Sequence, residues 1–265
     1  MPKKKVSFKL ERIDMTNTIE RFSNRVENYV KYRPGYPPEV LGLFKSELGL
    51  TADSVVADIG SGTGMSARMF LENGNVVYGV EPNDAMRAAA EEYLSDFPAF
   101  RSIKGTAEET GLDVDSIDFA VSAQAFHWFD QTAAKREFAR ILKPGGYAVL
   151  IWNQRQVDTT PFLREYEDFL LKYANDYTLV RHENVTEEAL EGFLGKPFSR
   201  NAFKNVQIFD FDGLKGRLLS SSYMPSESDA RYDGMINELE TLFAKHAENG
   251  RIEVFYDTQV YWSSI

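Results

Sequence analysis

The sequence predicts an α/β protein built on a doubly wound, mostly parallel β-sheet of about seven strands, with one antiparallel strand and a helical cap. Short segments that are apolar throughout alternate with segments of helical periodicity, and a glycine-rich turn follows the first apolar segment. Strands that are apolar on both faces are typical of parallel sheets covered by helices on both sides. Right-handed crossovers then produce the doubly wound arrangement.

The predicted elements follow one another regularly. Apolar residues recur at helical spacing over 18–31, and this helix ends before the prolines of residues 33–38, after which a helix is predicted over 38–48. The central alternation comprises strands at 54–59, 76–80, 100–104, 116–122 and 147–152, with helices at 65–73, 84–94 and 132–142. The last third of the chain predicts helices at 162–173, 186–193 and 231–246, and strands at 206–211 and 252–261.

These elements divide the chain into four segments. Residues 1–16 form a flexible tail, and residues 17–50 form a helical segment that acts as a lid. The cofactor-binding core spans 51–153. Residues 154–265 supply a helical cap and the final strands of the same domain.

Composition excludes several classes of function. A net charge of -10 opposes a broad nucleic-acid interface, which depends on clustered Lys and Arg. The chain has no cysteine, so disulfides, thiolate metal sites and a cysteine nucleophile are excluded. No apolar run reaches the roughly 20 residues that span a bilayer. We therefore expect a cytoplasmic protein without nucleic-acid or membrane partners; the oligomeric state is open.

The glycine-rich turn predicts a nucleotide-type cofactor. Gly60, Gly62 and Gly64 directly follow an apolar strand and precede a helix, whose first N–H groups can bind a ligand at the carboxyl edge of the sheet. Glu81 lies 21 residues after Gly60 at the end of the next strand, where a carboxylate can accept hydrogen bonds from a ribose. The spacing differs from the G-x-G-x-x-G of dinucleotide enzymes. An adenosine-containing cofactor is expected whether the protein is a dinucleotide enzyme or belongs to another class with this type of turn.

Five motifs resemble those of the class I S-adenosylmethionine-dependent methyltransferases, whose core is Rossmann-like. They are Asp58-Ile59-Gly60-Ser61-Gly62-Thr63-Gly64, Glu81-Pro82, Gly105-Thr106-Ala107-Glu108, Ala123-Gln124-Ala125-Phe126-His127-Trp128-Phe129 and Leu142-Lys143-Pro144-Gly145-Gly146. The similarity extends to the small-molecule branch that includes trans-aconitate methyltransferase-like enzymes, through residues 29–37 and 256–261.

The resemblance implies roles for individual residues. The backbone of residues 60–64, including Ser61 and Thr63, would hold the methionine part of S-adenosylmethionine, with Asp58 organising the loop and Glu81 beside Pro82 binding the ribose. The adenine would lie near Asn83, Met86, Thr106, Ala107 and Glu108, and Gln124 would line the pocket near the sulfonium. Tyr32 and Arg33 would close over the cofactor from the lid. The substrate pocket would contain Tyr29, Phe126, His127, Trp128 and Phe129. The product would be S-adenosylhomocysteine.

Methyl transfer needs an aligned nucleophile and no covalent enzyme intermediate, so proximity and orientation can supply most of the catalysis. His127 is a candidate general base, although a role in fixing its loop beside Trp128 and Phe129 is the favoured interpretation. An ionised carboxylate acceptor would need no base. Arg33, Arg155 and Arg181 are candidates for binding a substrate anion. No histidines have metal-ligand spacing, and no metal is expected.

The sequence therefore predicts a methyltransferase that acts on a small molecule, with a carboxylate oxygen as one possible acceptor. Two alternatives stay open. A nicotinamide-dependent (NAD-type) oxidoreductase shares the strand, the glycine turn and the ribose-binding acid, but the shorter glycine spacing and the further motifs oppose it. A noncatalytic domain that binds S-adenosylmethionine and regulates a partner would share all of the motifs.

Overall fold

The computed structural model describes residues 31–175 and 185–265. The predicted helix over 18–31, Tyr29 and Arg181 lie largely or wholly outside this part of the chain. The helices are α3 (Pro38–Ser46), α4 (Met65–Glu72), α5 (Asp84–Tyr93), η1 (Phe126–Trp128), α6 (Gln131–Ile141), α7 (Pro161–Tyr173), α8 (Glu187–Leu194), α9 (Phe211–Leu219) and α10 (Tyr232–His246). The strands are β1 (Val55–Ile59), β2 (Val76–Val80), β3 (Phe100–Ile103), β4 (Ile117–Ala123), β5 (Leu142–Arg155), β6 (Ser199–Phe209) and β7 (Ile252–Ser264).

All seven strands belong to one sheet, in the order β3-β2-β1-β4-β5-β7-β6. The strands β1 to β5 are parallel to their neighbours, whereas β7 runs antiparallel to both β5 and β6. The order reverses at β1, so the loops after β1 and β4 leave the sheet side by side at its carboxyl edge. This is the position at which open α/β sheets bind ligands. The predicted fold class is confirmed.

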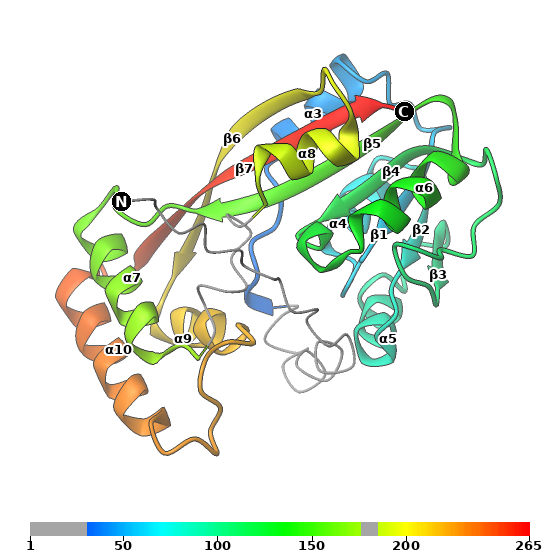
Figure 1. The fold of residues 1–265 in the computed structure, drawn as a ribbon. Coiled ribbons are helices and arrows are strands. Elements are labelled where there is room, and N and C mark those ends of the chain that lie inside the picture. Colours follow the sequence, from blue (N-terminus) through cyan, green and yellow to red (C-terminus); the bar gives the residue numbers. More distant parts are fainter. Residues whose placement is uncertain (1–30, 176–184) are drawn as a thin grey trace, which may run out of the picture.

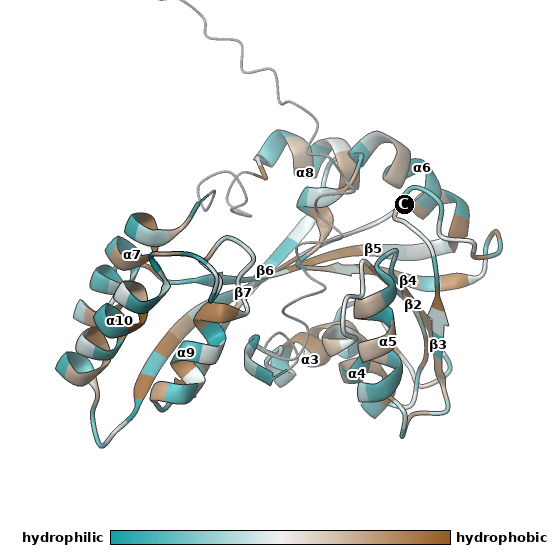
Figure 2. Cartoon of the chain, turned by 90° about the horizontal axis from the view of Figure 1, so that it is seen from below, coloured by the Kyte–Doolittle hydropathy of each residue, from teal (hydrophilic) through white to brown (hydrophobic). Residues whose placement is uncertain are grey.

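Helices cover both faces of the sheet (Figure 1). On one face, α6 and α8 bury Phe138 and Phe193, and the two rings meet edge to face with centroids 5.1 Å apart. On the other face, α3 and α4 bury Phe44 and Phe70, whose centroids are 5.0 Å apart. Figure 2 shows helices with mixed hydrophilic and hydrophobic residues, as expected for helices that cover an apolar sheet. Burial on both faces fixes the carboxyl edge of the sheet as a rigid platform.

Three strands extend past this platform into a second lobe. β5 continues beyond the end of β4, and it carries β7 and β6 with it to the helices α7, α9 and α10 (Figure 1). Those helices enclose a separate apolar core, which includes Leu163, Leu214, Met235 and Tyr256. Because β5 is parallel to β4, the carboxyl edge of the sheet faces this second lobe.

The structure corrects two predicted boundaries and adds one helix. β5 begins at Leu142, five residues before its predicted start, with a register irregularity opposite residues 117–119. β6 begins at Ser199, seven residues before its predicted start, because its first residues are exposed at the sheet edge and lack an apolar pattern. The helix α9 was not predicted, since Gly213 and Gly216 lower helix propensity.

A membrane-spanning helix is not found among the described residues, since no helix there is long and apolar enough.

Candidate functional site

The loop between β1 and α4 is shaped by three left-handed glycines. Gly60, Gly62 and Gly64 have φ values of +71°, +54° and +82°, which side chains disfavour. A Cβ on Gly60 would lie 2.5 Å from Ala125 Cβ, and one on Gly64 would lie 2.6 Å from Leu94 Cδ1. A Cβ on Gly62 would have no atom within 4 Å. Gly60 and Gly64 thus permit close packing, whereas Gly62 faces open space.

Asp58 lies fully buried beneath this loop. Its Oδ2 accepts a hydrogen bond of 2.6 Å from the Ser66 hydroxyl, whereas Oδ1 has no hydrogen-bond partner among the described residues. Burial raises the pKa of Asp58 to about 7 against the lowering effects of the Ser66 hydroxyl and the Ala67 amide, and the nearby Glu81 carboxylate adds to the increase. A buried oxygen atom without a donor is costly, so this carboxylate favours a cationic or hydrogen-bond-donating ligand.

Glu81 joins the glycine loop to the end of β2. Its Oε2 accepts from the Gly62 amide and its Oε1 accepts from the Asn83 amide, each at 2.9 Å. Burial raises the pKa of Glu81, although the two amide donors oppose that shift. The neighbouring Pro82 continues this turn into α5. Each carboxylate oxygen has a second lone pair, so Glu81 can accept further hydrogen bonds from hydroxyl groups.

The predicted adenine residues have structural partners of their own. Asn83 caps α5, because its Oδ1 accepts from the amides of Ala85 and Met86 at 2.9 and 3.1 Å, and the Met86 side chain is buried. Thr106 Oγ1 accepts from the amides of Glu108 and Glu109, at 3.3 and 3.2 Å.

Two further residues predicted to lie near the adenine connect the loop after β3 to the core. Ala107 is buried in the core between the sheet and α6, and Glu108 Oε1 accepts from the Asp130 amide at 2.8 Å. Asp130 in turn caps α6. The loop after β3 is therefore held in place, and its contact with adenine stays a prediction.

The loop after β4 lies against the glycine loop. Gln124 adopts φ +66°, an unusual conformation for a residue with a side chain, directly at the end of β4. Phe129 approaches Gly60, since a Cβ there would lie 3.5 Å from its ring. The structure thus brings the first and fourth motifs together, as the topology predicts.

The aromatic residues of this loop differ in burial. Phe126 is fully buried, and its ring meets Trp152 and Phe193 with centroids 6.0 and 4.7 Å away. His127 and Trp128 are partly buried, with ring centroids 4.6 Å apart and a tilt of 45°. Phe126 therefore supports the loop from the core. Contact of His127, Trp128 and Phe129 with a substrate stays a prediction.

The lid residues that the structure describes contact the second lobe. The Tyr32 ring packs on α9, where a Cβ on Gly216 would lie 2.1 Å from its Cε2. Arg33 Nη2 donates to the Ser220 carbonyl at 3.0 Å. Arg155 is paired with Glu167 and lies over the Tyr166 ring, 5.3 Å from its centroid. The Arg155 side chain is therefore neutralised within the protein.

A polar cluster that the sequence did not predict holds the segment 32–35. Asn153 Nδ2 donates to the carbonyls of Pro34 and Gly35 at 3.2 and 3.1 Å, and Asn205 Nδ2 donates to Gly35 at 2.8 Å. Asn153 Oδ1 accepts from the Thr258 hydroxyl at 2.6 Å. The only sign of this cluster in the sequence was that Asn153, Asn205 and Thr258 are polar residues in or next to predicted strands. The register of the strands makes them neighbours.

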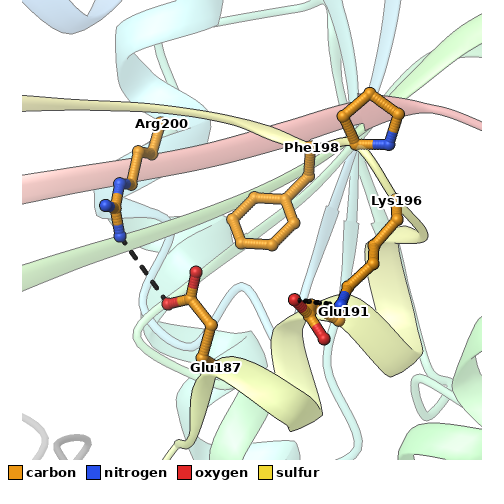
Figure 3. Close-up of a pocket in the computed structure, with 6 residues that line it drawn as sticks. Glu187, Glu191, Lys196, Phe198 and Arg200 are labelled. Atoms are coloured by element: carbon orange, nitrogen blue, oxygen red, sulfur yellow. Dashed lines mark ion pairs between the residues drawn. The ribbon is translucent and has the colours of Figure 1, made fainter.

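A shallow pocket lies apart from these motifs, between α8 and the start of β6. Figure 3 shows its residues, with ion pairs of 3.6 Å between Glu187 and Arg200 and 2.6 Å between Glu191 and Lys196. None of the predicted site residues lines it. Within residues 31–175 and 185–265, no three His, Cys, Asp or Glu residues are grouped so that they could hold a metal ion.

Comparison with known proteins gives concordant results. The family model for a methyltransferase domain matches residues 57–150. An uncharacterised methyltransferase of Mycobacterium tuberculosis is 38% identical over 138 residues, which cover 51% of this chain and 52% of the relative. The chain thus spans about half the length of that relative. An uncharacterised methyltransferase-like protein of Schizosaccharomyces pombe is 25% identical over 252 residues, covering 92% and 95% of the two chains.

Solved structures share the fold. A candidate type II methyltransferase from Anaeromyxobacter dehalogenans has a TM-score of 0.67 at 22% identity, covering 88% of this chain and 98% of the other. A candidate methyltransferase from Anabaena variabilis has a TM-score of 0.59 at 19% identity, covering 89% and 100%. None of these four proteins is described as a trans-aconitate methyltransferase, so that branch stays a prediction. Residues 57–150 therefore match a methyltransferase domain, and the motifs and the seven-stranded fold agree with a domain of the class I S-adenosylmethionine-dependent type.

Proposed function

We propose that the protein transfers a methyl group from S-adenosylmethionine to a small-molecule acceptor. The observation that carries this proposal is Asp58, a fully buried carboxylate beneath the glycine loop whose Oδ1 has no hydrogen-bond partner among the described residues. The ammonium group of the methionine moiety matches this oxygen in charge and in hydrogen-bonding capacity. Gly62 also supports the proposal, because a Cβ at this position would meet no atom within 4 Å and the loop therefore has open space beside it.

The same observation opposes a nicotinamide dinucleotide. Asp58 and Glu81 lie close enough that the Glu81 carboxylate adds to the rise in the pKa of Asp58. A pyrophosphate on the glycine loop would bring two further negative charges toward these carboxylates, at a cost in electrostatic energy. A cofactor that carries an ammonium and a sulfonium group is attracted to them.

The chain's residues would divide the work of binding. The amides of the glycine loop would bind the methionine carboxylate, and Asp58 would accept from the ammonium group. Glu81 would accept from the ribose hydroxyls, while Asn83 and Met86 on one side and the residues 106–108 on the other would flank the adenine. When bound, S-adenosylmethionine supplies an electrophilic methyl group on its sulfonium.

The acceptor would bind between the carboxyl edge of the sheet and the second lobe. Gln124, with its unusual backbone conformation at the end of β4, would face the reacting groups, and Phe129 would wall the pocket beside Gly60. Catalysis would come from proximity and orientation, which can lower a barrier by several kcal/mol. His127 would position its loop, and it would serve as general base only for a hydroxyl or amine acceptor.

Two measurements test the proposal. Calorimetric titration with S-adenosylhomocysteine and with reduced nicotinamide adenine dinucleotide should show binding of the former alone; tight binding of only the latter would refute the methyltransferase assignment. Incubation of a metabolite library with radiolabelled S-adenosylmethionine should label an acceptor, and base lability of the product identifies a methyl ester. Cofactor binding without transfer to any compound would instead favour the noncatalytic regulatory domain.

A further inference from the structure

Within the described part of the chain, an arginine of the second lobe has only neutral partners. Arg217 lies on α9, and its side chain is partly buried. Its Nε donates to the Tyr256 hydroxyl at 3.4 Å, and its Nη1 donates to the hydroxyls of Ser221 and Ser220 at 3.1 and 3.5 Å. The Tyr256 hydroxyl donates its own hydrogen bond to Gln207 Oε1 at 2.9 Å. The guanidinium is thus surrounded by hydroxyl groups.

Arg217 differs in this respect from its neighbour in the same lobe. Arg155 forms an ion pair with Glu167, whereas no carboxylate of the described residues forms an ion pair with Arg217. A guanidinium has five N–H groups, and the bonds within the described part of the chain engage only Nε and Nη1. Among the described residues, the two N–H groups of Nη2 thus have no hydrogen-bond partner, and they can donate to a ligand.

The surroundings of Arg217 favour an anion. Burial alone lowers its pKa, but Tyr256, Tyr223 and Tyr166 more than compensate, so that the pKa lies above its ordinary value and the charge is retained. A cation that is partly removed from water without a counter-ion is costly, and an anionic ligand would relieve that cost. Arginine binds carboxylates through two parallel hydrogen bonds, which fix orientation as well as charge.

The position of Arg217 matches that of an acceptor site. α9 is the helix of the second lobe nearest the first lobe (Figure 1). Ser220, which binds Arg217 through its hydroxyl, accepts from Arg33 of the lid through its carbonyl. In the sheet, Tyr256 of β7 lies opposite Arg155 of β5, whereas the end of β4 lies opposite Ile151. These two positions on β5 are four residues apart, which corresponds to about 14 Å along the strand. A small molecule of ordinary size, together with the long arginine side chain, can bridge that span.

We propose that Arg217 binds the carboxylate of the methyl acceptor, and that the acceptor is therefore a small organic acid. This inference rests on the proposed methyltransferase function and adds the class of the acceptor. Arg217 would act as a binding and orienting residue, with the two N–H groups of its Nη2 directed to the carboxylate. A single unpaired guanidinium matches the single charge of a carboxylate better than the double charge of a phosphate monoester.

The test compares acids with their neutral counterparts. Radiolabelled S-adenosylmethionine is incubated with the full-length protein and a library of hydroxy-, amino- and polycarboxylic acids, in parallel with the same compounds as primary amides. We expect labelling of at least one acid and none of its amide. Labelling of neutral compounds only, or of no acid, overturns the inference.

Variants then assign the effect to Arg217. Arg217→Met should lower kcat/KM for the accepted acid by about 100-fold or more, and Arg217→Lys by less, because lysine keeps the charge but loses the paired hydrogen bonds. Lys215→Met removes a positive charge from the same helix and should leave kcat/KM unchanged. A change of less than threefold in Arg217→Met overturns the inference.

Binding of S-adenosylhomocysteine separates this result from the proposed function. Arg217→Met should bind S-adenosylhomocysteine like the wild type, which also shows that the variant is folded. If the wild type binds S-adenosylhomocysteine but methylates no acid, only the acid assignment falls. If it does not bind S-adenosylhomocysteine, the methyltransferase function falls as well.

Discussion

The glycine loop provides a prediction in which stability and binding separate. Gly60→Ala places a side chain at φ +71°, which costs about 1–2 kcal/mol for an L-residue, and sets its Cβ 2.5 Å from Ala125 Cβ. Neither methyl group can rotate away, so the backbone must shift, at a cost of about 1–3 kcal/mol for an overpacked site. The free energy of unfolding should therefore fall by roughly 2–5 kcal/mol.

Gly62→Ala should behave differently, because its Cβ would meet no atom within 4 Å. Only the conformational cost applies, about 1–2 kcal/mol at φ +54°. The added methyl group projects toward the open space beside the loop, where we propose that the cofactor binds. Affinity for S-adenosylhomocysteine should fall at least tenfold, although the protein stays folded.

Urea unfolding and calorimetric titration measure the two effects. Gly111→Ala is a matched control, since Gly111 has φ +75° and open surroundings but belongs to none of the motifs. It should lose about as much stability as Gly62→Ala and keep wild-type affinity. Equal unfolding free energies for Gly60→Ala and Gly111→Ala would refute the packing argument. Wild-type affinity in Gly62→Ala would refute the placement of the cofactor.

Three further predictions concern single polar groups. Burial raises the pKa of Asp58 from 3.8 to about 7, so the stability that the protonated side chain provides is lost as pH rises through that range. Asp58→Asn should therefore stabilise the ligand-free protein by about 4 kcal/mol above pH 7 and not at all below pH 4. The same substitution should weaken S-adenosylhomocysteine binding. Urea unfolding with the same pH dependence in both proteins would contradict this. The hydrogen bond from Arg140 is the main cause that lowers the pKa of Glu137 to about 2, so Glu137→Gln should cost about 1–3 kcal/mol at pH 7, with the difference shrinking as pH falls from 4.5 toward 2 in thermal unfolding. Asn153→Ala should cost about 1–3 kcal/mol and accelerate hydrogen exchange of the Gly35 and Tyr36 amides, whereas unchanged exchange would show that its bonds to Pro34 and Gly35 do not hold that segment.

The local sequence patterns predicted the sheet well because they depend on neighbouring residues. Strands that are apolar on both faces must be covered on both sides, and this requirement identifies β1, β2 and β4 without any knowledge of their partners. The helix α9 was missed for the opposite reason. Its Gly216 lowers helix propensity, but the absence of a side chain is needed for the Tyr32 ring, a contact between residues 184 positions apart.

The candidate site divides in the same way. Asp58, Gly60 and Gly62 were predicted because the strand, the turn and the helix that contain them follow one another directly in the sequence. Glu81 was predicted because the second strand runs beside the first. The polar cluster around Asn153 could not be predicted, since it is assembled by the register of β5, β7 and β6. That register depends on pairing across more than a hundred residues.

The sequence by itself determined the fold class and the methyltransferase motifs of residues 57–150, because each rests on short-range spacing. Only the tertiary structure decided which charged groups are already neutralised. Arg155 looked available in the sequence but is paired with Glu167, whereas Arg217 carried no sequence signal and has only hydroxyl partners among the described residues. The electrostatic state of a side chain depends on neighbours that folding brings from distant parts of the chain.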